Sequence, residues 1–294
     1  MAMGNSDEIT REYFDKILIE LRQIDADLPD TKVTIFGEEF ATPVTTAALS
    51  HLNNTCENGM AKMAEGAKLA GALCFSGMGE KEEIEAMCAT GAKVIKIVKP
   101  HANEEDIFRE ICEAEAAGAF GVGMDIDHAF NGSGGYDSVF GQEMRPKTLE
   151  QLKSYIAATK LPFVIKGVLS VSDAKKAVEA GAAGIVVSHH HGIMNYAVPP
   201  LYILPEIVAA VGGKVTIFVD CDIESGMDVF KALALGADAV SVGRAIMGPL
   251  KEKDADGVKE KLQAMTGELR AVMGRTGFKR IGEMDASVLH FRTF

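Results

Sequence analysis

Charged and polar side chains follow four short apolar runs in the second half of this 294-residue chain. The first run ends with a lysine, and the second is followed by a serine and histidines. The third run ends with an aspartate, and the fourth is followed by a glycine–arginine pair. The stretches are Ile165 to Gly167, Val187 to Gly192, Phe218 to Asp220 and Ser241 to Arg244. If the runs are neighbouring parallel strands of a barrel, these groups meet at the rim where ligands bind. We therefore expect a small-molecule site there.

Lys166 ends an otherwise apolar strand. Burying an ammonium group is costly unless it meets an anion or takes part in chemistry. Two roles are open for it: a nucleophile that forms a Schiff base, or a fixed cation that stabilises negative charge on a bound ring. Lys166 is therefore a candidate catalytic residue.

Three consecutive histidines, 189–191, follow the next run. The two-residue period of a strand points His190 away from its neighbours, so we expect one face of the triplet to serve the pocket. Because such a triplet cannot surround a zinc ion, we expect no metal; one histidine with Asp220 or Asp222 is the alternative. A histidine beside a carboxylate such as Asp125 would instead be a tuned general base.

The Gly243–Arg244 pair ends the last run and opens a helical segment. Backbone N–H groups at a helix N-terminus point at an anion, and a guanidinium can clamp it with two parallel hydrogen bonds. The last strands of a barrel are also its usual phosphate position. The pair therefore predicts a phosphate-bearing ligand.

The elements that must position these residues alternate regularly along the chain. The apolar runs are Pro43–Leu49, Ala72–Ser76, Lys93–Val98, Gly121–Asp125, Pro162–Gly167, Gly184–His189, Val215–Asp220 and Asp238–Gly243. Segments with helical periodicity include Ser6–Ile24, Glu104–Ala117, Thr148–Thr159, Ser172–Ala180, Gly226–Leu235 and Asp254–Met273. Near-continuous apolar strands separated by helices indicate a parallel sheet, and eight such units close a barrel. We predict an α/β fold, a TIM (β/α)8 barrel with short N- and C-terminal helices. It is one domain over residues 1–294, with a helical extension over about 1–32 and the barrel over 33–294.

Composition narrows the class of protein. The net charge of −12 argues against a nucleic-acid partner, because phosphate binding needs a concentrated basic surface. No run of eighteen apolar residues occurs, so we expect no membrane span, and the polar N-terminus argues against a secretory signal. The five cysteines lack metal-type spacing, which favours reduced thiols in the cytoplasm.

The connection between Asp127 and Thr148 is long and rich in glycine. Connections of this length between barrel elements are uncommon and often carry function. Two interpretations are open: a mobile lid over the rim, or a surface loop without a role.

In these motifs the chain resembles the FMN-dependent α-hydroxy acid oxidases and dehydrogenases, the family of the glycolate and lactate oxidases. The resemblance runs from about Val33 to His290 and is strongest over three stretches. These are Ile165 to Leu169, Val187 to Ile207 and Asp228 to Arg244. It implies FMN as cofactor, hydride transfer between a small-molecule substrate and flavin N5, and a homo-oligomer, a tetramer or octamer.

The resemblance also implies roles for individual residues. His190 would be the catalytic base, Asp125 its orienting partner, and Lys166 the cation beside the N1–C2=O edge of the flavin. The residues implied to bind the cofactor are Thr46, Ala47, Ala48, Ser76, Lys166, Ser188, Asp220, Asp222, Gly243 and Arg244.

The expected substrate pocket departs from the family pattern. Ile193 replaces an arginine that would hold the substrate carboxylate, and Lys96 and Val98 replace a glutamine and a tyrosine. His128 stands where the lid lacks a second arginine, and Glu224 replaces an arginine of the phosphate loop. Each lost arginine removes a charge-assisted anchor worth roughly 1.5–3 kcal/mol. We therefore expect a substrate other than a simple 2-hydroxy acid, unless Lys96, Lys99 or His128 binds the carboxylate.

Three functions follow from these observations. The first is an FMN-dependent oxidoreductase with a histidine base and an altered substrate pocket. The second is a flavin-free barrel lyase or isomerase that acts on a phosphorylated metabolite through Lys166 and His190. The third is a non-catalytic flavin-binding protein whose substrate residues have been lost.

Overall fold

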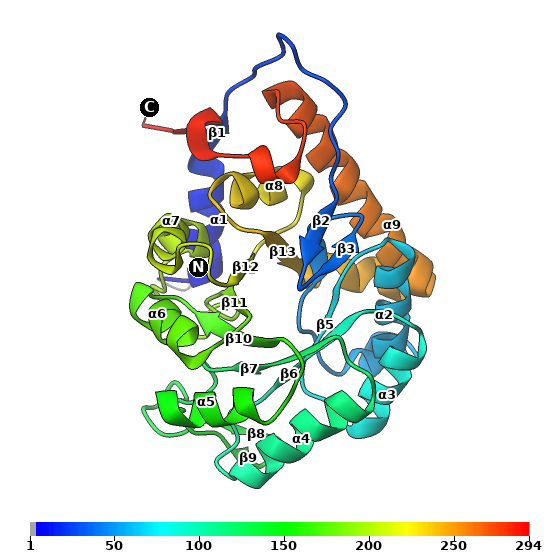
Figure 1. Ribbon diagram of the computed structural model, residues 1–294, viewed down its shortest axis with the longest axis vertical. Helices are drawn as coiled ribbons and strands as arrows, with labels where there is room; N and C mark the ends of the chain where they lie inside the picture. Colours follow the sequence, from blue (N-terminus) through cyan, green and yellow to red (C-terminus); the bar gives the residue numbers. More distant parts are fainter. Residues whose placement is uncertain (1–3, 294) are drawn as a thin grey trace.

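The computed structural model describes residues 4–293 and shows eight parallel strands that close into a barrel (Figure 1). The strands hydrogen-bond in the order β4 (Val44–Thr46), β13 (Ala239–Val242), β12 (Thr216–Val219), β11 (Gly184–Val187), β10 (Phe163–Val168), β7 (Gly121–Asp125), β6 (Val94–Val98) and β5 (Cys74–Ser76). The ring closes because the backbone N–H of Thr46 donates to Leu73 O at 3.2 Å and Leu49 pairs with Ser76. Every strand overlaps its predicted run, and the predicted TIM barrel is confirmed.

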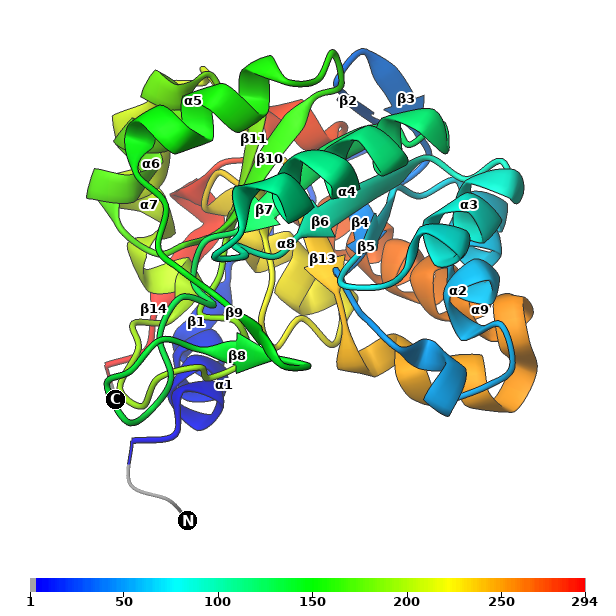
Figure 2. The same cartoon turned by 90° about the horizontal axis from the view of Figure 1, so that it is seen from below.

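Helices cover the outside of the barrel (Figures 1 and 2). Those that follow barrel strands are α2 (Gly59–Leu69), α3 (Lys81–Ala89), α4 (Glu104–Ala116), α5 (Leu149–Ala157), α6 (Val171–Ala180), α7 (Pro200–Val211), α8 (Gly226–Ala234) and α9 (Arg244–Thr276). Helix α9 packs against α2, so the last unit meets the first (Figure 1). The predicted helices between strands are confirmed to within two residues at each end.

Alternation along the strands produces two apolar layers. Phe75, Ile95, Ile97 and Phe218 fill the inside of the barrel, where the rings of Phe75 and Phe218 meet edge to face at 5.1 Å. The other faces of the strands pack against the helices. The hairpin of β2 (Val33–Ile35) and β3 (Glu38–Phe40) adds Ile35 to the inner layer. Because the interior is filled with apolar side chains, polar chemistry is confined to the rim.

The two ends of the chain pair with each other. Helix α1 (Ser6–Lys16) ends at Lys16, and β1 (Ile17–Ile19) pairs antiparallel with β14 (Leu289–Phe291). The predicted helix over Ser6–Ile24 is therefore too long, because β-branched Ile17 and Ile19 favour the extended backbone that this pairing uses.

Helix α9 is interrupted at Lys253 and Asp254, where the backbone leaves helical values. Its second part corresponds to the predicted C-terminal helix, and its first part opens directly at Arg244. Short 3₁₀ helices η1 (Leu52–Asn54), η2 (Ile281–Glu283) and η3 (Ala286–Val288) complete the helical elements. Among the described residues, no helix is both long and apolar enough to cross a membrane.

Candidate functional site

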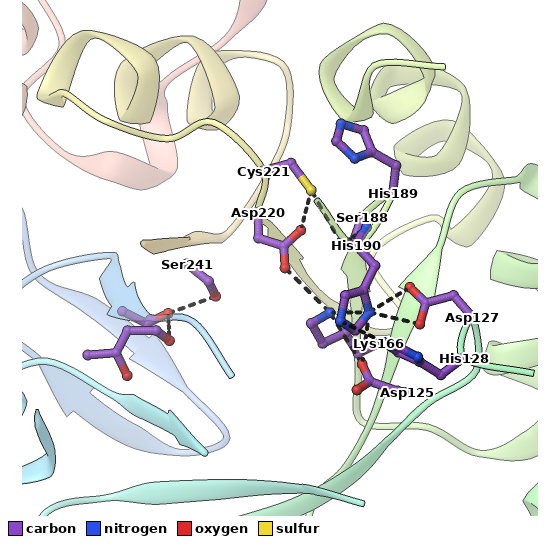
Figure 3. Close-up of polar contacts among 12 residues, drawn as sticks. Asp125, Asp127, His128, Lys166, Ser188, His189, His190, Asp220, Cys221 and Ser241 are labelled. Carbon is purple, nitrogen blue, oxygen red and sulfur yellow. Dashed lines mark hydrogen bonds and ion pairs between the residues drawn. The ribbon is translucent and has the colours of Figure 1, made fainter. Parts of the chain in front are cut away.

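The carboxyl ends of the barrel strands bring the predicted polar residues to one rim. Strands β7 and β10 pair so that Lys166 lies directly beside Asp125. Asp220 follows β12 and His190 follows β11, and Figure 3 shows both turned toward Lys166. The rim predicted from four separate sequence motifs is thus a real cluster of side chains.

Lys166 is buried within a network of charges. Its Nζ lies 3.2 Å from Asp125 Oδ1, 3.7 Å from Asp220 Oδ2 and 3.3 Å from His190 Nδ1. Lys99 Nζ binds the other oxygen of Asp125 at 2.6 Å. Burial alone would lower the pKa of Lys166, but Asp125 and then Asp220 raise it above its ordinary value. Lys166 is therefore a permanent cation, which disfavours a Schiff-base role because that role needs the free amine.

Asp125 lies between the two lysines. Burial would raise its pKa, but Lys166 and Lys99 hold it well below the ordinary value. Its carboxylate therefore stays ionised and neutralises charge that the barrel has buried. The shortest contacts of Asp125 are thus with the two lysines, whereas the sequence predicts that it orients the imidazole.

The carboxylate nearest to the imidazole belongs to Asp127. His190 Nδ1 lies 2.9 Å and 3.1 Å from the two Asp127 oxygens, compared with 3.7 Å from Asp125 (Figure 3). Gly167 makes room for this contact: its φ is +90°, and a Cβ there would lie 2.5 Å from Asp127 Cγ. Asp127 is thus the nearer carboxylate, while Asp125, the expected orienting partner, lies within ion-pair distance of His190, and its role stays a prediction.

His128 makes a second contact to the same imidazole. The Nε2 atoms of His128 and His190 are 3.1 Å apart, and His128 Nδ1 lies 3.1 Å from Asp137 Oδ2. Ionised carboxylates only accept hydrogen bonds, so each Nδ1 must carry a proton for Asp127 and Asp137. One further proton must then lie between the two Nε2 atoms. Burial, followed by Lys99 and His190, lowers the pKa of His128 below its ordinary value.

Asp127, His128 and His190 are also the described residues whose ligand atoms lie close enough together, within 4.8 Å, to hold a metal ion. They differ from the alternative with Asp220 or Asp222 that the sequence left open. The three groups already bind one another, and the Lys166 cation lies 3.3 Å from His190 Nδ1. A metal ion there would face that positive charge at close range, so the arrangement favours proton transfer over metal binding.

The histidine triplet does not continue as a strand. Strand β11 ends at Val187, and His190 and His191 adopt positive φ angles of 48° and 54°. His189 turns away to Thr10 at 2.8 Å, whereas His190 and His191 both line the mouth. The expectation of a single face holds only if the strand continues through the triplet, and here a turn replaces the strand alternation.

The loops after β12, β13 and β4 enclose a cavity of about 230 Å³ beside His190 and Lys166. Ala47, Ala48, Asp220, Cys221, Asp222, Ile223, Glu224, Gly243 and Arg244 contribute to its wall. Arg244 Nη2 binds Asp222 Oδ1 at 2.6 Å and lies 3.7 Å from Asp7 Oδ2. Burial, and then Asp7, raise the pKa of Asp222 to about 6. The cavity therefore has one end at Lys166, where the lysine is paired with aspartates, and an acidic end at Asp222.

Several predicted site residues lie elsewhere. Lys96 donates to the carbonyls of Gly77 and Gly79 at 2.6 and 3.2 Å, and Val98 packs in the outer layer. Both were placed on the wrong face, because Ile95 and Ile97 occupy the inward positions of β6. Thr46, Ser76 and Ser188 are buried but do not line the cavity, and Ile193 is 40% exposed.

Three residues of the site were missed or misplaced by sequence reasoning. Asp127 lies two residues after Asp125, just beyond the end of β7, and Lys99 follows the inward residues of β6, so the period of two could have found both. Asp7 gave no such signal, because it reaches the mouth from α1 through tertiary packing. The connection after β7 forms a hairpin of β8 (Ser138–Val139) and β9 (Gln142–Glu143), and it carries Asp137 on its approach.

Comparisons with known proteins agree with this geometry. The 4-hydroxymandelate oxidase of Amycolatopsis orientalis is 48% identical over 142 residues, covering 48% of this chain and 40% of that protein. The L-lactate oxidase of Nostoc sp. is 39% identical over 170 residues, covering 57% and 46%. These two alignments span less than half the length of the relatives. Human 2-hydroxyacid oxidase 2 is 27% identical in an alignment covering 98% of this chain and 92% of that protein.

A solved structure extends the likeness to nearly the whole chain. The crystal structure of mandelate oxidase superposes with a TM-score of 0.88 at 31% identity, covering 99% of this chain and 91% of that one. The FMN-dependent dehydrogenase family matches residues 3–150 and 132–291. A barrel that brings a lysine and a histidine to one rim, and that matches this family along almost all its length, belongs to the FMN-dependent dehydrogenase family, as the sequence predicted.

Proposed function

We propose that this chain is an oxidoreductase that uses His190 as its base and oxidises a substrate less acidic than a simple 2-hydroxy acid. Membership of the FMN-dependent dehydrogenase family confirms the predicted enzyme class and its cofactor, FMN, at the level of the family. The observation that carries the proposal is the convergence of Lys166 and His190, whose Nζ and Nδ1 atoms are 3.3 Å apart beside the cavity.

The residues at the inner end of the cavity fit a flavin ring. Lys166 offers a permanent cation, Ala47 and Ala48 offer a wall of small side chains, and Asp220 stands beside Lys166. A Cβ at Gly243 would lie 3.5 Å from that of Ala47, so glycine keeps this part of the cavity open. The acidic end near Asp222 fits a phosphate less well. Bound FMN would supply the acceptor for a hydride from the substrate carbon.

The chain itself handles the proton. His190 takes the hydroxyl proton of the substrate at Nε2 as the carbon–hydrogen bond breaks, and a carbonyl product forms. Asp127 fixes the ring through Nδ1 and stabilises the imidazolium. His128 lies at the same Nε2, so it must move aside or hand over its contact when the substrate enters.

The charges at the mouth support a substrate without a free carboxylate. Lys99 and Lys166 are occupied by Asp125, and Arg244 by Asp222. Lys96 faces away from the mouth, so it offers no carboxylate anchor. Of the three replacements considered from the sequence, His128 remains, and its lowered pKa makes it a weak partner for an anion. An ester, an amide or another neutral α-hydroxy compound matches this mouth better.

Anaerobic reduction of the bound flavin tests the proposal. Purified protein should be yellow, and mandelamide or a lactate ester should bleach it faster than mandelate, lactate or glycolate. A His190→Ala variant should keep its colour without being bleached by any of them. Rapid bleaching by lactate would overturn the substrate assignment. A purified protein that binds no flavin would overturn the assignment as an oxidoreductase.

We also propose a homo-oligomer, a tetramer or octamer, acting in the cytoplasm on a small molecule, with neither nucleic acid nor membrane as partner. The family resemblance supports the assembly. Five cysteines without a disulfide among the described residues support a reducing compartment. Light scattering of the purified protein gives the mass of the assembly directly, and a monomeric mass would contradict the first part.

A further inference from the structure

The loops after β12 and β13 carry an unusual balance of charge. In a barrel these loops and the N-terminus of the following helix form the position where phosphate binds. Here Arg244, the residue that opens α9, forms ion pairs with Asp7 and Asp222, and Glu224 lines the same cavity. The place where this fold expects an anion is therefore lined mainly by anions.

Asp222 is the centre of this acidic cluster. Its side chain is only 7% exposed, although it belongs to a loop. One oxygen binds Arg244 at 2.6 Å, while Oδ2 is buried without a hydrogen-bond partner among the described residues. A buried carboxylate oxygen in this state lacks a donor, and a ligand hydroxyl is the kind of group that would supply one.

The nearby cations are already bound to other groups. Arg244 faces both Asp222 and Asp7, and His191 Nδ1 lies 2.5 Å from Asp7 Oδ2. Arg11 Nη2 binds Asp228 at 2.9 Å, and Lys261 Nζ binds the main-chain oxygen of Glu224 at 2.9 Å. To hold a phosphate, Arg244 would have to leave a carboxylate that is more buried than itself.

A phosphate dianion and a hydroxyl group meet this cluster differently. The dianion is repelled by three carboxylates and, as an acceptor, cannot satisfy Asp222 Oδ2. The terminal hydroxyl of a ribityl chain carries no charge and can donate to that oxygen. We propose that this end of the cavity selects against the phosphate, so that the chain binds riboflavin at least as tightly as FMN. This inference rests on the proposed flavin site and specifies its ligand.

Equilibrium binding of the two flavins tests the inference without any measurement of turnover. Full-length protein is stripped of flavin, and FMN and riboflavin are titrated separately at pH 8 while flavin fluorescence is followed. Each protein is described by one ratio, the riboflavin Kd divided by the FMN Kd. We expect a ratio of 1 or less in the wild type. Asp222→Asn should raise the ratio about tenfold by tightening FMN alone, and Glu224→Gln should raise it by a smaller factor.

Controls separate this inference from the proposed function. Asp256→Asn, at a residue 70% exposed on α9, removes the same charge away from the cavity and should leave the ratio unchanged. Glu224→Gln provides a second test if Asp222→Asn fails to fold. A wild-type ratio above 1, or a ratio that neither variant changes, would overturn the inference while leaving the enzyme class intact. If neither flavin binds, the proposed function fails instead.

Discussion

The two ends of the cavity hold similar numbers of charged groups but arrange them in opposite ways. At the base end, Lys166 and His190 lie among Asp125, Asp127 and Asp220 (Figure 3), and Lys99 binds Asp125 from the other side. At the phosphate end, Arg244 faces Asp7, Asp222 and Glu224. The first end is neutralised by the protein itself, whereas the second carries surplus negative charge that a ligand must tolerate.

Because of this difference in charge pairing, the base end has a fixed geometry, whereas the phosphate end can respond to its ligand. Buried, mutually paired charges are costly to rearrange, so the base end presents one geometry to every substrate. An acidic cluster with an unpartnered oxygen responds to the charge of whatever enters. Family resemblance alone predicts a cofactor-binding role for both ends, but the charges of the second end do not suit a phosphate.

Removing the central cation should have the largest effect. Lys166→Met leaves Asp125 and Asp220 without their shared partner, and breaking a buried pair typically costs about 3–5 kcal/mol. Urea unfolding should therefore show a loss of about this size. Lys153→Met, at an exposed pair with Glu150, is the matched control and should change stability by about 0.5 kcal/mol or less. Equal losses in the two variants would contradict the description of the base end.

Asp125 and Asp127, two of the three aspartates at the base end, should respond differently to amide substitution. His190→Ala removes the base and should slow flavin reduction by roughly 10²–10⁴-fold. Asp127→Asn should also slow reduction, with a small change in melting temperature, because it orients the imidazole. Asp125→Asn should mainly lower stability, because it leaves two lysines unneutralised. Stopped-flow rates and thermal melts on both variants decide between the roles, and the reverse pattern would restore Asp125 as the orienting residue.

A smaller change tests whether Asp127 acts through position. Gly167→Ala places a Cβ 2.5 Å from Asp127 Cγ at a φ of +90°. The clash should displace the carboxylate from His190 and slow reduction by about tenfold, because misplaced groups lose orientation. Gly181→Ala, also at a φ of +90° but 4.0 Å from its nearest neighbour, controls for backbone strain. Equal rates of flavin reduction in the two variants would show that Gly167 does not position Asp127.

The acidic end should show a modest dependence of stability on pH. Burial raises the pKa of Asp222 to about 6, above its unfolded value, with Asp7 and Glu224 raising it and Arg244 and His191 lowering it. The folded state then binds the proton more tightly, so this contribution is most favourable at low pH and is lost as pH rises through about 6. Asp222→Asn should therefore melt about 2–4 °C higher than wild type at pH 7.5, with the gap closing toward pH 4. A gap that widens on acidification would contradict this sign.

Sequence patterns predicted the barrel better than the faces of its strands. The eight apolar runs located every strand of the barrel, because a parallel sheet buried on both sides demands such runs. Lys96 and Lys99 show the limit: both follow apolar residues, but only the register places one in the outer layer and the other at the rim.

Long-range packing accounts for the remaining errors. Asp7 approaches Arg244 from another part of the chain, and the left-handed backbone of His190 and His191 follows from a turn that no local pattern announces. The hairpin of β8 and β9 was read as a lid or a loop, and its mobility stays a prediction. The roles proposed for the site residues likewise await the measurements above.

The short pairing of β1 with β14 has a consequence for the mouth. Helix α1 runs directly into β1, and it presents Asp7 to His191 and Thr10 to His189. Strand β14 thus holds β1 and α1 in place, and α1 in turn contacts the histidine turn from outside the barrel. Replacing Leu289 with a charged residue would weaken the pairing of β14 with β1. Because β1 continues from α1, the change should also displace α1 and the turn that carries His190.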